Sequence, residues 1–156
     1  MNYWLLKSEP DVFGIDHLIK MPRKTEHWDG VRNYQARNFM RDSMKKGDLA
    51  FFYHSNCKEP GIVGVVRIVR EAYPDHTAFD PKCKYYDPNS EPAKPRWFMV
   101  DVKYDRRLKR PISLKELKQQ TTLKSMKLLQ RGNRLSVMPV EKSDWDHILK
   151  LETACC

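Results

Sequence analysis

Hydrophobic residues in the first half of the chain gather in short runs that are typical of β-strands. Residues 3–7 form an apolar run that stops before Pro10, which predicts a strand at the start of the chain. Residues 48–55 and 61–73 predict two more strands, joined by a hairpin loop at 56–60. The later strand carries valine and isoleucine on both faces, so it suits a barrel wall or a sheet covered by a helix.

A helical period follows these patterns from Asn33 onward. Its apolar residues, spaced at i, i+3, i+4 and i+8, are Ala36, Phe39, Met40 and Met44. Asn33 is a suitable N-cap residue, and Gly47 is expected to end the helix. Asn33, Arg37 and Arg41 lie four residues apart and therefore share a polar face.

Shorter elements and one long loop complete the chain. We expect strands at 96–104 and 134–138, and helices at 15–19, 123–129 and 141–152. Ser113 and Glu116 form a capping-box signature for a further short helix. Residues 74–95 are rich in proline and polar residues, and such a loop inside a compact domain is often functional. It is not a domain linker, because neither side could close a core alone.

Size and composition restrict the class of protein. The 156 residues favour one domain, placed at 1–152, with a disordered tail at 153–156. No apolar run approaches the ~20 residues of a membrane span, and the N-terminus lacks the pattern of a signal peptide. The four cysteines (Cys57, Cys83, Cys155 and Cys156) form no CxxC pair. We therefore expect free thiols, no metal, no membrane contact and a monomer in the cytoplasm, associated with the nucleoid in a bacterium or nuclear in a eukaryote.

The positive charge is concentrated in one part of the chain. Residues 94–134 contain thirteen Lys or Arg against three acidic residues, a local net charge of +10, whereas the whole chain carries +9. A local basic field suits a polyanion, and nucleic acid is the most common one. The alternative is a solvated surface that keeps the protein in solution.

Enzyme signatures are mostly absent. The chain contains no GxSxG, P-loop, HExxH or GxGxxG motif, and its five histidines are scattered. We therefore expect no catalytic residue and no cofactor. A site assembled from distant residues remains an alternative, because catalytic triads are not local in sequence.

Aromatic residues beside polar ones give the clearest candidate chemistry. Trp28 lies in a polar turn with Gly30, which permits close approach of the backbone. A single tryptophan is more often part of a core than of a site, but its polar neighbours favour a ligand here. Tyr53, His54, Ser55 and Asn56 are four consecutive hydrogen-bonding side chains at the end of a strand. They suit either an ordinary hairpin end or a contact to a base edge. Ser8 is as suited to capping a turn as to touching a ligand.

Several sequence blocks resemble the EVE domain. They are 3–10, 28–38, 51–56 and 60–64, continued by 72–75, 100–102 and 134–137. The resemblance covers residues 2–152. It implies an α+β, PUA-like pseudo-barrel, in which a strongly bent mixed sheet is surrounded by short helices. EVE domains are proposed to read modified bases in DNA, such as 5-methylcytosine.

The resemblance implies a non-catalytic reader that flips a modified base into an aromatic and polar pocket. The candidate pocket residues are Ser8, Trp28, Asn33, Tyr53, His54 and Ser55. The candidate contacts to the phosphate backbone are Arg32, Arg37, Arg41, Lys94, Arg96 and Arg134. DNA is the expected partner. The alternatives are RNA, an enzyme acting on modified nucleotides, and a module for a free small ligand.

Overall fold

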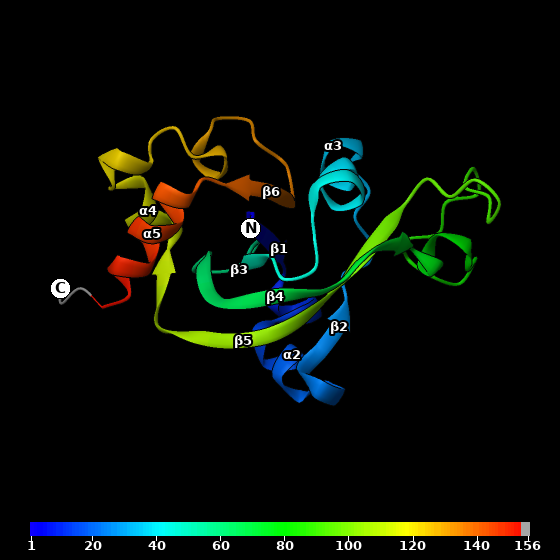
Figure 1. Cartoon of the computed structure of the whole chain (residues 1–156), viewed down its shortest axis with the longest axis horizontal. Coiled ribbons are helices and arrows are strands. Elements are labelled where there is room, and N and C mark those ends of the chain that lie inside the picture. The colour runs from blue at the N-terminus through cyan, green and yellow to red at the C-terminus, as the bar shows by residue number, and fades with distance from the viewer. Residues whose placement is uncertain (154–156) are drawn as a thin grey trace.

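One mixed sheet organises the chain, whose computed structural model describes residues 1–153. Its six strands have the order β2–β5–β4–β3–β1–β6. The strands are β1 (Tyr3–Ser8), β2 (Thr25–His27), β3 (Leu49–His54), β4 (Gly61–Pro74), β5 (Phe98–Ser113) and β6 (Val137–Val140). Strands β1 and β3 run parallel, and the other neighbours run antiparallel (Figure 1).

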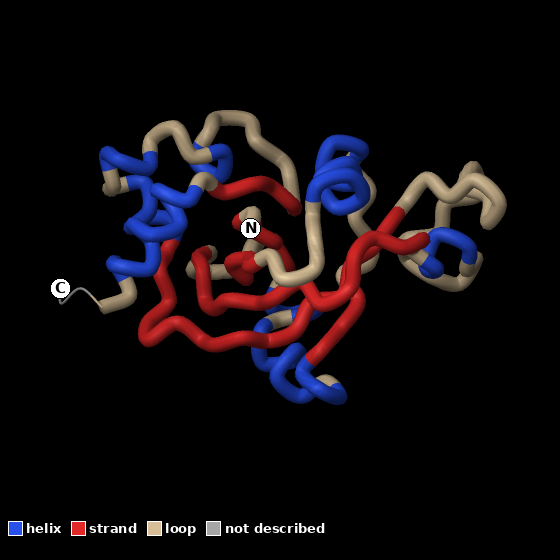
Figure 2. Tube along the Cα trace, viewed as in Figure 1, coloured by secondary structure: helices blue, strands red, loops and turns tan. Residues whose placement is uncertain are grey.

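The sheet is strongly bent but not closed. Strands β4 and β5 pair along most of their length, with four register shifts between residues 62 and 73 of β4. Such irregularities increase the local twist and let long strands curve. Figure 2 shows the strands curving around the N-terminal strand. The edge strands β2 and β6 do not pair with each other, so the barrel is incomplete. The predicted bent mixed sheet with short helices around it is confirmed.

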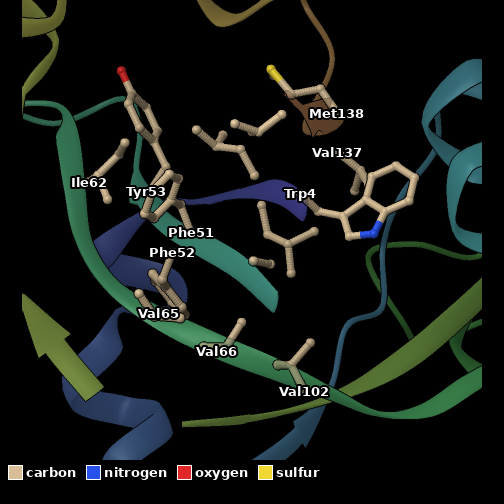
Figure 3. Close-up of a cluster of buried hydrophobic side chains, with 14 of the residues drawn as sticks. Trp4, Phe51, Phe52, Tyr53, Ile62, Val65, Val66, Val102, Val137 and Met138 are labelled. Carbon is tan, nitrogen blue, oxygen red and sulfur yellow. The ribbon is translucent and has the colours of Figure 1, made fainter. Parts of the chain in front are cut away.

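The core lies on both faces of β3. Phe51 and Phe52 point to opposite sides of the strand, and both are fully buried. Trp145 stacks on Phe51 with the ring centroids 3.9 Å apart, so the last helix covers this face. Trp4 is buried in the same cluster (Figure 3), and its indole N–H donates to Asp48 Oδ2 at 3.0 Å. Its polar atom is therefore satisfied without water.

Short helical segments surround the sheet. The α-helices are α1 (Pro10–Phe13), α2 (Ile15–Lys20), α3 (Tyr34–Asn38), α4 (Leu114–Lys118) and α5 (Lys142–Leu151). The 3₁₀ turns are η1 (Pro22–Lys24), η3 (His76–Phe79), η4 (Thr121–Leu123) and η5 (Lys127–Leu129), and η2 (Phe39–Ser43) is a π-helical turn. Two predicted caps are confirmed: Asn33 Oδ1 accepts the Ala36 N–H at 3.0 Å, and Ser113 Oγ accepts the Glu116 N–H at 3.1 Å.

Four predicted boundaries were wrong. The helix that starts after Asn33 widens into η2 and stops at Ser43, so Gly47 lies in the following turn. The helix expected at 123–129 is two separate 3₁₀ turns, and the strand expected from 134 begins only at Val137. Strand β5 extends nine residues beyond 104, because β4 offers a partner along that length. Pairing between distant strands decided the bounds of β5 and β6, and local patterns do not contain it.

No helix within residues 1–153 is long and apolar enough to cross a membrane. Cys57 and Cys83 are free thiols. Of the predicted tail, Thr153 is described and donates to the Lys150 carbonyl. Cys155 and Cys156 lie outside the described residues.

Candidate functional site

A pocket of about 620 Å³ opens where six segments meet. They are the end of β1, helix α1, strand β2 with its connection to α3, Ser55 after β3, the segment before β6, and residues 84–85 of the long loop. Two backbone contacts position the walls. The Ser55 N–H donates to the Ser8 carbonyl at 3.0 Å and joins two lining residues, and the Trp28 N–H donates to the Val100 carbonyl of β5 at 2.7 Å. We call this cavity the main pocket.

Trp28 forms an aromatic part of the wall. Its side chain meets Phe13 and Phe52 edge to face, with centroid distances of 6.3 and 5.4 Å. Only 6% of Trp28 is exposed, so the ring is held rigidly by the core and presents a small area to the main pocket. This small aromatic area can contact a planar ligand without moving.

Carboxyl groups line the wall beside Trp28. His27 bridges two of them: its Nδ1 lies 2.8 Å from Glu26 Oε1, and its Nε2 lies 3.3 Å from Asp29 Oδ2. Burial raises the pKa of the Asp29 carboxyl, although His27 acts in the opposite direction. Lys7 also lines the main pocket, and burial lowers the pKa of its ammonium group. The wall therefore offers both hydrogen-bond acceptors and a donor to a polar ligand.

The long loop contributes Tyr85 to the wall and is fixed by a buried carboxylate. Asp75 is fully buried and accepts hydrogen bonds from the Gly30 N–H at 2.9 Å and from Arg32 Nη1 at 3.0 Å. Asp75 also accepts from the backbone N–H and the hydroxyl of Thr77. Burial acts to raise the pKa of Asp75, but these hydrogen bonds outweigh it, and the net pKa is lowered.

Gly30 has a positive φ of 77°, and a Cβ there would lie 2.5 Å from the Tyr85 ring. The close backbone approach expected at this glycine is therefore made by Tyr85.

The structure brings three of the six predicted pocket residues to the main pocket. They are Ser8, Trp28 and Ser55, although the Ser8 hydroxyl also donates to the Phe13 carbonyl at 2.7 Å. Asn33 lies at a second, smaller hollow. The missed pocket residues include Asp29 and Tyr85. For Asp29 the available signal was its place beside Trp28 in the block 28–38. For Tyr85 the signal was the interleaving of aromatic and basic residues around the long loop.

Tyr53 and His54 do not line the main pocket. Tyr53 lies in the core cluster (Figure 3), where burial raises the pKa of its hydroxyl to about 12. His54 Nε2 accepts the Ile15 N–H at 3.2 Å, and burial lowers the pKa of its ring. Both side chains thus serve the packing between β3 and its neighbours.

The candidate phosphate contacts are distributed over different places. All five N–H groups of Arg32 are engaged within the protein, by the Val31 and Tyr85 carbonyls, Asp75 and Thr77, so Arg32 anchors the long loop. Arg37 donates to the Arg96 carbonyl at 2.8 Å.

Arg41 pairs with its neighbour Asp42. Lys94 and Arg96 are exposed on the long loop, and Arg134 lies at the main pocket.

The basic segment does not form one continuous free surface. Three of its arginines lie on β5 and form ion pairs with acidic residues elsewhere. These pairs are Arg106 with Glu152, Arg107 with Asp16, and Arg110 with Glu116. The first and third are bidentate, with distances of 2.7–2.9 Å. Three of the thirteen basic residues counted in the sequence therefore hold β5 against its neighbours.

Within residues 1–153, no group of three or more His, Cys, Asp or Glu side chains is placed to hold a metal ion.

Comparison with known proteins identifies the family. Residues 2–151 match the model of the EVE domain. The chain belongs to the EVE domain family. Thymocyte nuclear protein 1 of Mus musculus is 52% identical over 168 residues, which cover 97% of this chain and 74% of that protein. The predicted resemblance is therefore confirmed.

Solved structures of this EVE domain's relatives agree closely with its fold. The crystal structure of the human THYN1 protein in complex with 5-methylcytosine-containing DNA has a TM-score of 0.96 and 48% identity, and covers 100% of both chains. A Pseudomonas putida protein has a TM-score of 0.92 and 49% identity, covering 96% of this chain and 99% of that one. These matches confirm the predicted PUA-like fold class, with an open sheet.

Proposed function

We propose that this EVE domain is a non-catalytic reader of modified DNA, which binds a flipped 5-methylcytosine-type base in the main pocket. The observation that carries the proposal is the pocket of about 620 Å³ beside Trp28, in a fold that matches the human THYN1–DNA complex along its whole length. Ligand pockets of ~300–1,000 Å³ hold small planar molecules, and a base leaves its stack to reach such a site.

The walls supply the contacts that a base requires. Trp28 offers a fixed aromatic surface for stacking, and Ser8 and Ser55 offer hydroxyl groups on the polar side. We add Asp29 as the acceptor for the exocyclic amino group of cytosine. A carboxylate is a suitable partner for this N4 amino group.

Asp29 also gives the pocket a way to distinguish 5-methylcytosine from thymine. Thymine carries the same methyl group at C5, so the methyl group alone does not separate the two bases. They differ at position 4, where cytosine presents an amino donor and thymine presents an oxygen acceptor. A carboxylate accepts from the former and repels the latter. Selectivity against thymine then follows from an unfavourable contact as well as a favourable one.

Because DNA is the proposed partner, we propose that the protein acts in the nucleus of a eukaryote or in the nucleoid of a bacterium. The name of the curated relatives, thymocyte nuclear protein 1, supports the former. RNA is the second candidate partner, and a direct comparison of matched DNA and RNA strands tests it.

The test is a binding array with a blocked pocket. Ser55→Phe places a large ring in the main pocket, whereas Ser125→Phe adds the same ring at an exposed turn that lines neither cavity. Trp28→Ala is a poorer choice, because removing a buried tryptophan costs about 3–5 kcal/mol of stability. Circular dichroism and thermal melting check the fold of each variant.

The readout is fluorescence anisotropy with DNA and RNA strands that contain one cytosine or one 5-methylcytosine. We expect tighter binding to methylated DNA for the wild type and Ser125→Phe, and loss of this preference for Ser55→Phe. Equal affinity for both bases in the wild type contradicts the proposal. So does a new product in mass spectra of the incubated strands, which indicates catalysis. An affinity that does not respond to salt indicates a free small ligand.

A further inference from the structure

A second hollow of about 360 Å³ adjoins the main pocket. We call it the side groove. One wall comes from the start of α3, at Asn33 and Gln35, and the other from residues 127–135. Arg134 and Leu135 line both cavities, so the two are neighbours. Figure 1 shows the segment before β6 passing beside α3, which is the place where these walls face each other.

The chemistry of the side groove differs from that of the main pocket. Glu9, Glu26 and Asp29 line the main pocket, whereas none of the eight residues that line the side groove is acidic. The side groove contains two cations, Lys127 and Arg134, and the rest of its polar side chains are amides. A wall of cations and amides without a carboxylate suits an anion.

The loop that carries these cations is held in shape by its own amide side chains. Gln130 Nε2 donates to the Lys124 carbonyl at 2.8 Å, and Asn133 Nδ2 donates to the Lys127 carbonyl. Asn133 Oδ1 also accepts the Leu135 N–H at 2.9 Å. The backbone of the loop is therefore fixed by hydrogen bonds that leave the charged side chains unused.

Lys127 and Arg134 are both exposed. Among residues 1–153, no hydrogen bond or ion pair engages the charged end of either side chain. In this they differ from Arg106, Arg107 and Arg110, each of which has an acidic partner. Their positive charge is available to a ligand.

We propose that the side groove binds a phosphate of the DNA strand whose base occupies the main pocket, with Lys127 as the contact. Arg134, on the wall shared by both cavities, contacts the next phosphate toward the base. The proposal rests on the proposed function, because a flipped base stays attached to its backbone, which must leave the pocket along one of its walls. Phosphate contacts of this kind fix the register of a strand without reading its sequence.

The test pairs a change in the protein with a change in the DNA. Lys127→Gln removes the charge, and Lys124→Gln is the matched control, since Lys124 is exposed on the same loop but does not line the groove. The probes are single strands with one 5-methylcytosine, in which each nearby phosphate in turn is replaced by an uncharged methylphosphonate. The free nucleoside 5-methyl-2′-deoxycytidine is the probe without phosphate.

We expect Lys127→Gln to lower affinity for the strand about fivefold at 0.1 M salt, and to reduce the salt slope by about 0.7, as expected for one phosphate contact in a single strand. A methylphosphonate at one position should lower the affinity of the wild type and of Lys124→Gln by a factor similar to this fivefold loss. The same replacement should lower the affinity of Lys127→Gln less than twofold. Binding of the nucleoside should not change in either variant.

Two results would overturn the inference. One is a Lys127→Gln protein that binds the strand as the wild type does. The other is a loss that is the same at every methylphosphonate position, which indicates a diffuse field rather than a contact. A wild type that does not prefer 5-methylcytosine refutes the proposed function, not the phosphate contact. A coupling between Lys127 and one phosphate would support the contact even in that case.

Discussion

Replacing Asp29 by asparagine tests how the main pocket separates 5-methylcytosine from thymine. The carboxyl lines the pocket, and 30% of its side chain is exposed. Asparagine has nearly the same size, but it replaces one acceptor with an amide donor. The remaining amide oxygen still offers His27 an acceptor, and Glu26 stays at 2.8 Å from its Nδ1, so we expect the fold of the wall to be preserved.

The size of the effect follows from one hydrogen bond. A hydrogen bond to a charged group contributes about 1.5–3 kcal/mol, and partial exposure of Asp29 favours the lower end of this range. Binding of 5-methylcytosine loses this contribution in Asp29→Asn. Thymine gains a neutral bond from the new amide to its O4, worth about 1 kcal/mol. The preference for 5-methylcytosine over thymine should therefore fall by about 2.5 kcal/mol, roughly 60-fold.

The assay is fluorescence anisotropy on two single strands that differ only in this base. Single strands are needed because the cost of unpairing would differ between the two bases in a duplex. Glu9→Gln is the control for net charge, since Glu9 lines the same pocket while its Oε1 already accepts from Asn56 at 3.2 Å. If Asp29→Asn weakens both strands equally, or if Glu9→Gln reproduces the change, the reasoning is refuted.

Two further predictions concern the framework of the site. Asp75→Ala should lower the free energy of unfolding by about 3 kcal/mol, because Arg32 and the Gly30 N–H lose their buried partner; a urea titration that shows less than about 1 kcal/mol contradicts this. His54→Gln keeps an acceptor for the Ile15 N–H but does not titrate. Folding lowers the pKa of His54. The contribution of His54 to stability is therefore present above pH 6.5 and is lost as the pH falls through 6.5 toward the pKa of the folded state. The urea midpoint of the variant should fall less than that of the wild type between about pH 7.5 and about pH 5.5, and equal falls would refute the assignment.

Local signals in the sequence carried much of the fold. Asn33 and Ser113 were predicted as caps because their side chains act on backbone groups only three residues away. The strands at residues 48–55 and 61–73 followed from short apolar runs, and β3 and β4 lie within one residue of these bounds. Interactions between residues this close in sequence can be predicted from a short segment alone.

Contacts across the chain decided the rest. An alternating pattern assigns side chains to two faces, but both faces of β3 are covered, so the pattern did not show that Tyr53 and His54 lie away from the main pocket. The sequence did not show that the arginines on β5 have acidic partners. Arg106 meets Glu152 across 46 residues, and Arg107 meets Asp16 across 91.

The site itself shows the same division. The sequence by itself determined that Trp28 and its polar neighbours form a candidate wall, because they follow one another in one segment. Only the tertiary structure decided that Tyr85 completes this wall and that Lys127 lies at an adjoining groove without an acid. The physical reason is that a buried carboxylate, Asp75, fixes the loop that carries Tyr85, and that bent strands bring distant segments together. Neither the loop anchor nor the bend has a signature within a few residues.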